Sequence, residues 1–299
     1  MSNSAELGDQ KEVHLDSGTI RYRERGSGPA IVFVHPLLTN GDLWRHVVPE
    51  LASEYRCIAP DWPIGGHETP MNRDADLSPP GLARIIVDFL AALDLSDVTL
   101  VGHDTGGALS QIVVTEYPER IGRLVLLDCD AYENFPPKLL LPIVWSARLP
   151  GGDYLLVQSM RIAPLRRLPI AFGWLTKRPI DREIVMGSYL RPCLTNSDVR
   201  RDTRKFIKSI SHRYTLAAAK KFADFTKPVL IVWTPEDRIF PWKYAERLVG
   251  AFPNARLERI DDSYTFVPED QPHKLAQAIA SFMKSPWERG PQLSQEAAQ

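Results

Sequence analysis

Short apolar runs alternate with amphipathic helical patterns along most of the chain. The apolar or alternating runs predict eight strands over residues 13–15, 19–25, 31–34, 56–59, 97–100, 124–127, 229–233 and 256–260. Apolar residues at helical spacing predict helices over residues 42–50, 78–93, 108–117, 242–252 and 272–282. Repeated strand–helix units of this kind predict an α/β fold with a mostly parallel sheet and helices on both faces.

Two of these runs indicate the centre and the edge of the sheet. Residues 31–34 are continuously apolar, as expected for a strand that is covered on both faces. Residues 19–25 follow a turn, and we expect them to pair with residues 13–15 as an edge hairpin. Prolines at the start of the 78–93 pattern are typical of a helix that begins there.

The alternation of strands and helices stops after residue 129 and resumes at residue 226. The intervening segment contains helical fragments and several prolines but little strand pattern. We predict a helical lid over residues 130–225, inserted between two parts of a core domain at residues 11–129 and 226–285. Residues 286–299 are polar and poor in aromatic side chains, which predicts a disordered tail.

The composition is that of a soluble globular protein. The 299 residues are 44% hydrophobic and carry a formal net charge of -1, which gives no reason to expect a nucleic acid partner. Cys57, Cys129 and Cys193 are odd in number and widely spaced, which indicates reduced thiols in a cytoplasmic protein. The N-terminus does not read as a secretory signal, and no apolar run approaches the ~20 residues that a bilayer span needs. We therefore expect no membrane partner, and a monomer or a homodimer.

Charge is unevenly distributed along the chain. Residues 151–225 contain 15 Lys and Arg against 6 Asp and Glu. Such a segment can guide an anionic substrate toward a site. The other interpretation is that these residues form the solvated faces of surface helices.

The most informative stretch is residues 101–108, which read VGHDTGGA. A strand pattern precedes it and a helical pattern follows, which is the order of a nucleophile elbow. Gly102, Gly106 and Gly107 are expected where two backbones approach too closely for a Cβ atom. The exposed central residue is Asp104, whose carboxylate has an ordinary pKa near ~3.9 and is expected to be ionised at neutral pH. This predicts attack on an electrophilic carbon and an ester intermediate on the enzyme.

The elbow and the order of elements resemble the α/β-hydrolase superfamily over nearly the whole chain. An aspartate at the elbow is similar to that of haloalkane dehalogenases, fluoroacetate dehalogenases and epoxide hydrolases. The resemblance implies an eight-stranded sheet with an inserted lid. It also implies that Asp237, after the seventh strand, is the acid of the site, and that the backbone N–H groups of Leu37 and Thr105 form the oxyanion hole.

Three positions depart from the pattern of those families. Thr265 stands where the family has its catalytic histidine, just before the last helix. Thr105 stands where a tryptophan is common, and Leu37 where some dehalogenases have an asparagine. The halide-binding groups are therefore missing, which favours an epoxide slightly over a halide.

Without the histidine, release of the ester requires another base, because a threonine cannot deprotonate water at neutral pH. His35, beside the oxyanion loop, is the first candidate. His103 is a weaker one, because an elbow turns this side chain away from the site. Asp237 could act on water directly, and Asp128 and Asp130 at the end of the sixth strand are further candidates. Hydrogen bonding at the strand end is the competing interpretation of these last two.

Aromatic residues of the predicted lid are candidates to line the substrate pocket. They are Tyr132, Trp145, Tyr154, Trp174 and Tyr189. In the epoxide hydrolases that the chain resembles, two lid tyrosines protonate the opening oxygen.

The leading hypothesis is a hydrolase for a small-to-medium electrophilic substrate, with an epoxide preferred and a halide or an ester as alternatives. The rival hypothesis is a non-hydrolytic or impaired homologue: a ligand-binding protein, a lyase, an isomerase or a cyclase. No sequence motif calls for a metal ion or an organic cofactor.

Overall fold

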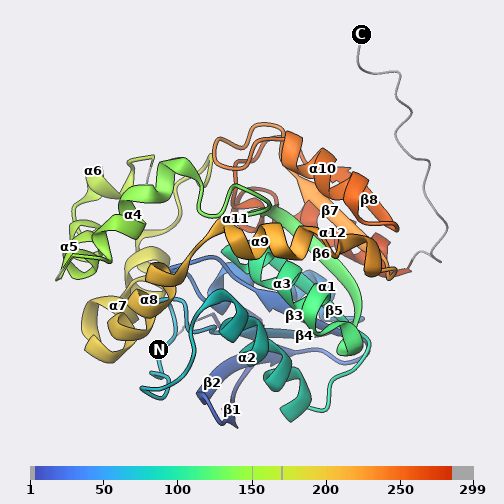
Figure 1. The fold of residues 1–299 in the computed structure, drawn as a ribbon, viewed down its shortest axis with the longest axis horizontal. Helices are drawn as coiled ribbons and strands as arrows, with labels where there is room; N and C mark the ends of the chain where they lie inside the picture. Colours follow the sequence, from blue (N-terminus) through green and yellow to red (C-terminus); the bar gives the residue numbers. More distant parts are fainter. Residues whose placement is uncertain (1–3, 150, 170, 285–299) are drawn as a thin grey trace.

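An eight-stranded sheet crosses the molecule in the order β1-β2-β4-β3-β5-β6-β7-β8 (Figure 1). The computed structural model describes residues 4–149, 151–169 and 171–284. The strands are β1 (Asp9–Leu15), β2 (Gly18–Arg25), β3 (Ala30–Val34), β4 (Arg56–Pro60), β5 (Val98–Asp104), β6 (Ile121–Cys129), β7 (Val229–Trp233) and β8 (Ala255–Arg259). Only the β1–β2 and β2–β4 pairs among them are antiparallel, so the predicted α/β fold with a mostly parallel sheet is confirmed.

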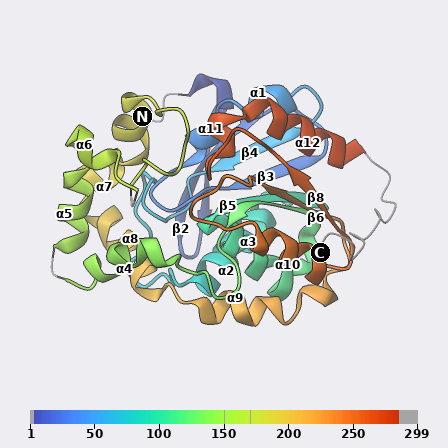
Figure 2. The same cartoon turned by 90° about the horizontal axis from the view of Figure 1, so that it is seen from above.

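Helices cover both faces of this sheet. They are α1 (Val48–Leu51), α2 (Pro79–Ala92), α3 (Thr105–Glu116), α4 (Leu141–Ser146), α5 (Gly152–Ser159), α6 (Ala163–Arg166), α7 (Arg191–Thr195), α8 (Ser197–Ser209), α9 (His212–Ala219), α10 (Lys243–Ala251), α11 (Val267–Asp270) and α12 (Pro272–Lys284). Figure 2 shows α1, α11 and α12 on one side of the sheet and α2, α3, α9 and α10 on the other. Each layer buries its own apolar cluster against the sheet.

The predicted helix over residues 42–50 is wrong in its extent. The chain forms a 3-10 turn at Gly41–Trp44 and the four-residue helix α1 at Val48–Leu51. Pro49 lies in the first turn of α1. Because a proline has no N–H to donate, it fits the first turn of a helix better than its interior, and the chain begins a new helix at Val48 instead of continuing one from residue 42.

The segment between β6 and β7 forms the helices α4 to α9. Helices α4 to α8 gather at one end of the molecule, beyond the edge of the sheet, whereas α9 returns along the core and packs against α3 (Figures 1 and 2). Every helix in the described part of the chain is too short or too polar to cross a membrane. The predicted tail over residues 286–299 lies outside the described residues.

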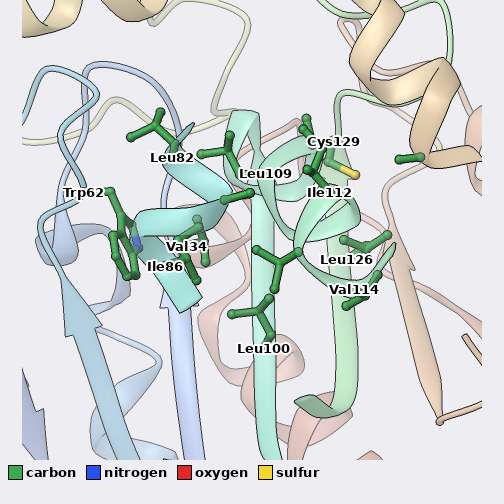
Figure 3. Packing of buried hydrophobic residues seen from close by; sticks show 14 of the residues in the cluster. Val34, Trp62, Leu82, Ile86, Leu100, Leu109, Ile112, Val114, Leu126 and Cys129 are labelled. Carbon is green, nitrogen blue, oxygen red and sulfur yellow. The ribbon is translucent and has the colours of Figure 1, made fainter. Parts of the chain in front are cut away.

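The turn from β5 into α3 is held by close backbone packing. A Cβ atom on Gly106 would lie 2.1 Å from the carbonyl oxygen of Val34, and one on Gly107 would lie 2.3 Å from Cβ of Cys129. Apolar side chains of β5 and α3, among them Leu100 and Leu109, pack against neighbouring strands (Figure 3). The predicted close approach at these glycines is confirmed, and it fixes the position of the residue between β5 and α3.

Candidate active site

Asp104 is the last residue of β5 and lies at the start of α3. Its backbone has φ 53° and ψ −123°, a conformation that side-chain-bearing residues rarely adopt. The strained turn presents the carboxyl group at the C-terminal edge of the sheet. The geometry is that of the nucleophile elbow predicted from the sequence.

The two oxygens of the Asp104 carboxyl group have different surroundings. Oδ1 accepts hydrogen bonds from the backbone N–H and from the hydroxyl of Thr105, the latter at 2.9 Å. Oδ2 has no hydrogen-bond partner in the part of the chain that the structure describes, and Asp104 borders an internal cavity. One oxygen is therefore held in place while the other remains available for reaction.

Burial changes the charge state of this carboxyl group. Desolvation raises the pKa of Asp104 to about 7, against the opposing hydrogen bonds from Thr105 and with a further contribution from the charge of Asp237. At neutral pH only about half of the molecules therefore carry the carboxylate. This differs from the expectation of a fully ionised Asp104, because desolvation dominates and no cation among the described residues offsets it.

The cavity beside Asp104 has a volume of about 80 Å³ and an apolar lining. For comparison, an engineered cavity of about 150 Å³ in another protein accommodates a benzene molecule. Its lining side chains are aliphatic or aromatic apart from those of the elbow, and they include Leu37, Leu38, Leu140, Ile143, Leu156, Val157, Met160, Phe172, Leu175, Leu190 and Phe266. The site therefore fits a small, uncharged chemical group next to Asp104.

Asp237 and Thr265 are in contact, as the sequence predicted, and this contact lies outside the cavity wall. The Thr265 hydroxyl donates to Oδ1 of Asp237 at 3.0 Å, in the place where a histidine would bind the acid. The same oxygen accepts the backbone N–H groups of Ile239 at 2.6 Å and Phe240 at 3.0 Å. Thr265 is fully buried, and neither residue borders the cavity. Burial raises the pKa of Asp237 to about 6.

A second carboxyl group supports Asp237 from β6. Asp128 accepts the backbone N–H of Thr234 at 2.9 Å and its hydroxyl at 3.2 Å. A side-chain hydrogen bond joins Asp128 to Asp237, and desolvation raises the pKa of Asp128 well above its usual range. The raised pKa favours the protonated form of Asp128, which is the form that can donate to Asp237. The contacts with Thr234 are those that the strand-end interpretation of Asp128 predicts.

Asp130 approaches the nucleophile instead. Its Oδ2 lies 3.5 Å from the Thr105 hydroxyl, which also contacts Asp104. Desolvation, followed by the neighbouring charge of Asp104, raises the pKa of Asp130 well above its usual range. The raised pKa favours the neutral form of Asp130, which would add no negative charge beside Asp104.

The two histidines considered as substitute bases have no access to the cavity. His35 Nδ1 lies 2.9 Å from the carbonyl oxygen of Pro36, and Nε2 accepts the backbone N–H of Trp62 at 2.8 Å. Desolvation lowers the pKa of both His35 and His103 to about 3. The His103 ring packs edge-on against Phe266, with its centroid 5.3 Å away. Both residues are neutral structural groups.

None of the five predicted aromatic pocket residues borders the cavity. Tyr189 is fully buried and its hydroxyl donates to Glu269, and Tyr132 packs under Arg247. Trp145 and Tyr154 are exposed, and Trp174 lies under the guanidinium group of Arg238. The aromatic residues that do line the cavity are Phe172 and Phe266. Sequence reasoning overlooked them because an isolated phenylalanine gives no signal that separates a pocket wall from ordinary packing.

Comparisons with known proteins agree with this geometry. A family model described as alpha/beta hydrolase fold matches residues 29–272. The chain therefore belongs to the α/β hydrolase fold family.

Individual proteins of known name are similar to the chain in sequence or in fold. Haloalkane dehalogenase 2 of Mycobacterium tuberculosis is 29% identical over 275 residues, which cover 88% of this chain and 90% of that protein. Cis-3-alkyl-4-alkyloxetan-2-one decarboxylase of Shewanella oneidensis is 28% identical over 279 residues, or 88% of this chain and 85% of that protein. The solved structure of epoxide hydrolase CorEH without ligand shares the fold, with a TM-score of 0.76 at 19% identity over 92% of this chain and 98% of that one. The sequence similarity to a haloalkane dehalogenase is confirmed, and so is the prediction of an enzyme of the hydrolase family. The epoxide hydrolase structure shares the fold.

The described residues contain no group of three or more His, Cys, Asp or Glu side chains arranged to hold a metal ion. Each of the four aspartates of the site has one carboxyl oxygen that contacts backbone N–H groups or a threonine hydroxyl within the described residues.

Proposed function

We propose that this chain is a hydrolase that attacks a small, largely apolar electrophile with Oδ2 of Asp104. The observation that carries the proposal is the asymmetry of the carboxyl group: Oδ1 is held by Thr105, and Oδ2 is unpaired beside an apolar cavity. In the reaction, Oδ2 forms a bond to the electrophilic carbon and the leaving group departs with its electron pair. With a haloalkane the product is an alkyl ester on Asp104 and a free halide, and with an epoxide it is a hydroxyalkyl ester, whose ring oxygen takes the electron pair and a proton from solvent. An activated ester, attacked at its acyl carbon, gives a mixed anhydride on Asp104 instead.

The oxyanion donors serve the second step of this mechanism. Water adds to the carbonyl carbon of the ester, and the developing negative charge falls on the oxygen that Thr105 already contacts. The Leu37 N–H makes no hydrogen bond to any residue in the described ranges, and Leu37 borders the cavity, so we assign it as the second donor. Cleavage of the bond then releases an alcohol from the alkyl ester, or a carboxylic acid from the anhydride, restores the carboxylate and passes one proton of the attacking water to solvent.

The second step has no efficient base. Thr265 and Asp237 are sealed from the cavity, and His35 and His103 are neutral and engaged in packing. A positioned base contributes about 10² to 10⁴ to the rate of such a step. We therefore propose that hydrolysis of the ester limits turnover.

The substrate remains an epoxide, a halide or an ester. The initial preference for an epoxide relied on the missing halide-binding groups at Thr105 and Leu37. Against it, no tyrosine among the described residues borders the cavity as a proton donor for the opening oxygen. We therefore propose no preference among the three classes of electrophile. We also propose that α4 to α8, within residues 130–225, act as the lid, because Ile143, Leu156 and Val157 from this segment close the cavity above Asp104.

Mass spectrometry of the intact protein tests the proposal. The protein is incubated with panels of epoxides, haloalkanes and activated esters, and the modified peptide is then mapped. We expect an adduct on Asp104 that accumulates faster than product appears, and no adduct on an Asp104→Asn variant. In water labelled with ¹⁸O, one turnover should place the label in the Asp104 carboxyl group. Product formation without label in Asp104 would contradict the covalent mechanism.

A second function is favoured by the pKa of Asp104. A carboxyl group whose pKa is about 7 is well matched to proton transfer at neutral pH. The chain would then be a lyase or an isomerase, and the Shewanella relative carries a decarboxylase name. Exchange of substrate C–H protons with deuterated solvent, abolished by Asp104→Asn and without an adduct, would select this function over hydrolysis.

A further inference from the structure

A second, larger space lies in the lid segment next to the cavity. It has a volume of about 440 Å³, and Phe172 borders both spaces. Its polar lining comes from Arg166, Arg167, Thr176, Lys177 and Arg182. None of the described residues that line it is acidic.

Most of this positive charge has no acidic partner. Arg166 donates to the backbone carbonyls of Met160 at 2.7 Å and Arg161 at 3.0 Å, which holds the guanidinium group in place without neutralising it. Arg167 and Arg182 are exposed and form no ion pair with any residue within the described ranges. Lys177 differs, because it pairs with acidic residues of the core.

The basic helix α8 provides a contrast within the same segment. Arg201 pairs with Asp198 at 2.9 Å and with Asp202 at 2.8 Å, and the Lys205 ammonium group donates to backbone carbonyls. The guanidinium group of Arg200 lies over the ring of Tyr154, 4.8 Å from its centroid. The interpretation of surface helix charge therefore suits α8, whereas the arginines of the cleft are unmatched and converge on one space.

We propose that this cleft binds the carboxylate group of an amphipathic substrate whose apolar end enters the cavity at Asp104. The guanidinium group offers parallel N–H donors that match a carboxylate. The cavity of about 80 Å³ accommodates only a few carbon atoms, so an ionised head group has to remain outside it. The inference deepens the proposed function and rests on it for the identity of the reacting end.

Binding of octanoate and of octan-1-ol to the full-length protein, measured by calorimetry, tests the inference. The variant Arg167→Gln/Arg182→Gln removes two unmatched cations. Arg178→Gln is the control, because Arg178 is an exposed cation of the same segment that pairs with Asp262 and does not line the cleft. We expect the double variant to weaken octanoate binding about 5- to 10-fold and octan-1-ol binding less than about 2-fold, with little effect from the control. Octanoate affinity should also fall as salt is raised.

Inorganic phosphate separates a general anion site from a substrate subsite. Phosphate that displaces octanoate from the wild type, but not from the double variant, supports a head group in the cleft. Equal octanoate affinity in the wild type and the double variant, or phosphate binding that leaves octanoate unaffected, would overturn the inference. Asp104→Asn separates the two proposals: it should retain the octanoate response while it loses the adduct. An adduct that persists in the Asp104→Asn variant would contradict the assignment of Asp104 as the nucleophile, but it would not contradict the anion site.

Discussion

The candidate active site has two halves, and the fold constrains them differently. One half is the β5–α3 turn with the proposed nucleophile Asp104, and the other contains the proposed acid Asp237. The nucleophile half, at the β5–α3 turn, keeps the strained backbone, the N–H donor of Thr105 and an open cavity. The acid half, at Asp237, keeps its backbone hydrogen bonds, but it contains a threonine and a second carboxyl group and is closed to the cavity.

The difference indicates that one half of the site can change in sequence while the other keeps its geometry. Gly106 and Gly107 lie within contact distance of β3 and β6, so the shape of the elbow is part of the packing of the core. The histidine position carries no such constraint, because a threonine hydroxyl satisfies the acid at 3.0 Å. A base can therefore be lost while the nucleophile remains in position.

The largest expected effect comes from restoring the base. Thr265→His should place an imidazole group against Asp237 and accelerate breakdown of the ester on Asp104 by about 10² to 10⁴. The rate is read from loss of the adduct mass after excess electrophile is removed. Thr265→Val, which adds no base, is the control. Since Thr265 is fully buried, the melting temperature of each variant has to be measured as well. An ester that breaks down equally fast in the wild type and the histidine variant would show that another group already serves as base.

Removing the charge of the nucleophile should stabilise the fold. The pKa of Asp104 is about 7 when folded and near 3.8 when unfolded, so its contribution to stability is complete below about pH 4 and lost as the pH rises through 7. Asp104→Asn should therefore increase the free energy of unfolding at pH 8 by on the order of 3–4 kcal/mol, and by much less at pH 4. Denaturant unfolding at both pH values provides the measurement. A gain that is the same at both would show that burial does not shift this carboxyl group.

The same pKa sets the pH dependence of attack. The rate of adduct formation should rise about tenfold per pH unit below 7 and level off above about 8, because only the carboxylate reacts. Single-turnover rates between pH 5 and 9 give this profile. A flat profile over this range would place the pKa of Asp104 at its ordinary value and weaken the contrast between the two halves.

The smallest effect is expected at Asp128. A protonated Asp128 resembles an asparagine, so Asp128→Asn should change the free energy of unfolding by less than about 1 kcal/mol at pH 7. Asp128→Ala leaves the Thr234 donors and Asp237 without partners and should cost about 2–4 kcal/mol. Equal losses in the two variants would contradict the assignment of a proton to Asp128.

Sequence reasoning identified the parts of the site that lie in continuous motifs. The elbow, the strand–helix order and Asp237 were recognisable because glycine spacing and apolar periodicity are local signals. The contact of Thr265 with Asp237 followed from the same family pattern. The prediction of a single helix over residues 42–50 was wrong because it gave too little weight to Pro49, which lies in the first turn of α1.

Two features of the site had no local signal. The pKa of Asp104 depends on how many groups surround it, and the absence of a nearby cation is visible only in three dimensions. The absence of Asp237 and Thr265 from the cavity wall likewise depends on how the segment between β6 and β7 packs, as does the lining by Phe172. A further feature, outside the candidate active site, also had no local signal. The sequence showed only that residues 151–225 are basic, and not that Arg166, Arg167 and Arg182 line one space.

The contact between the buried Thr265 and Asp237 also affects how many molecules of electrophile each protein chain consumes. When an ester on Asp104 outlasts the experiment, each chain consumes a single molecule of electrophile. The capacity of a sample is then counted in copies of the protein rather than in turnovers per second. The fraction of modified chains becomes a cumulative record of exposure, which a later wash does not erase.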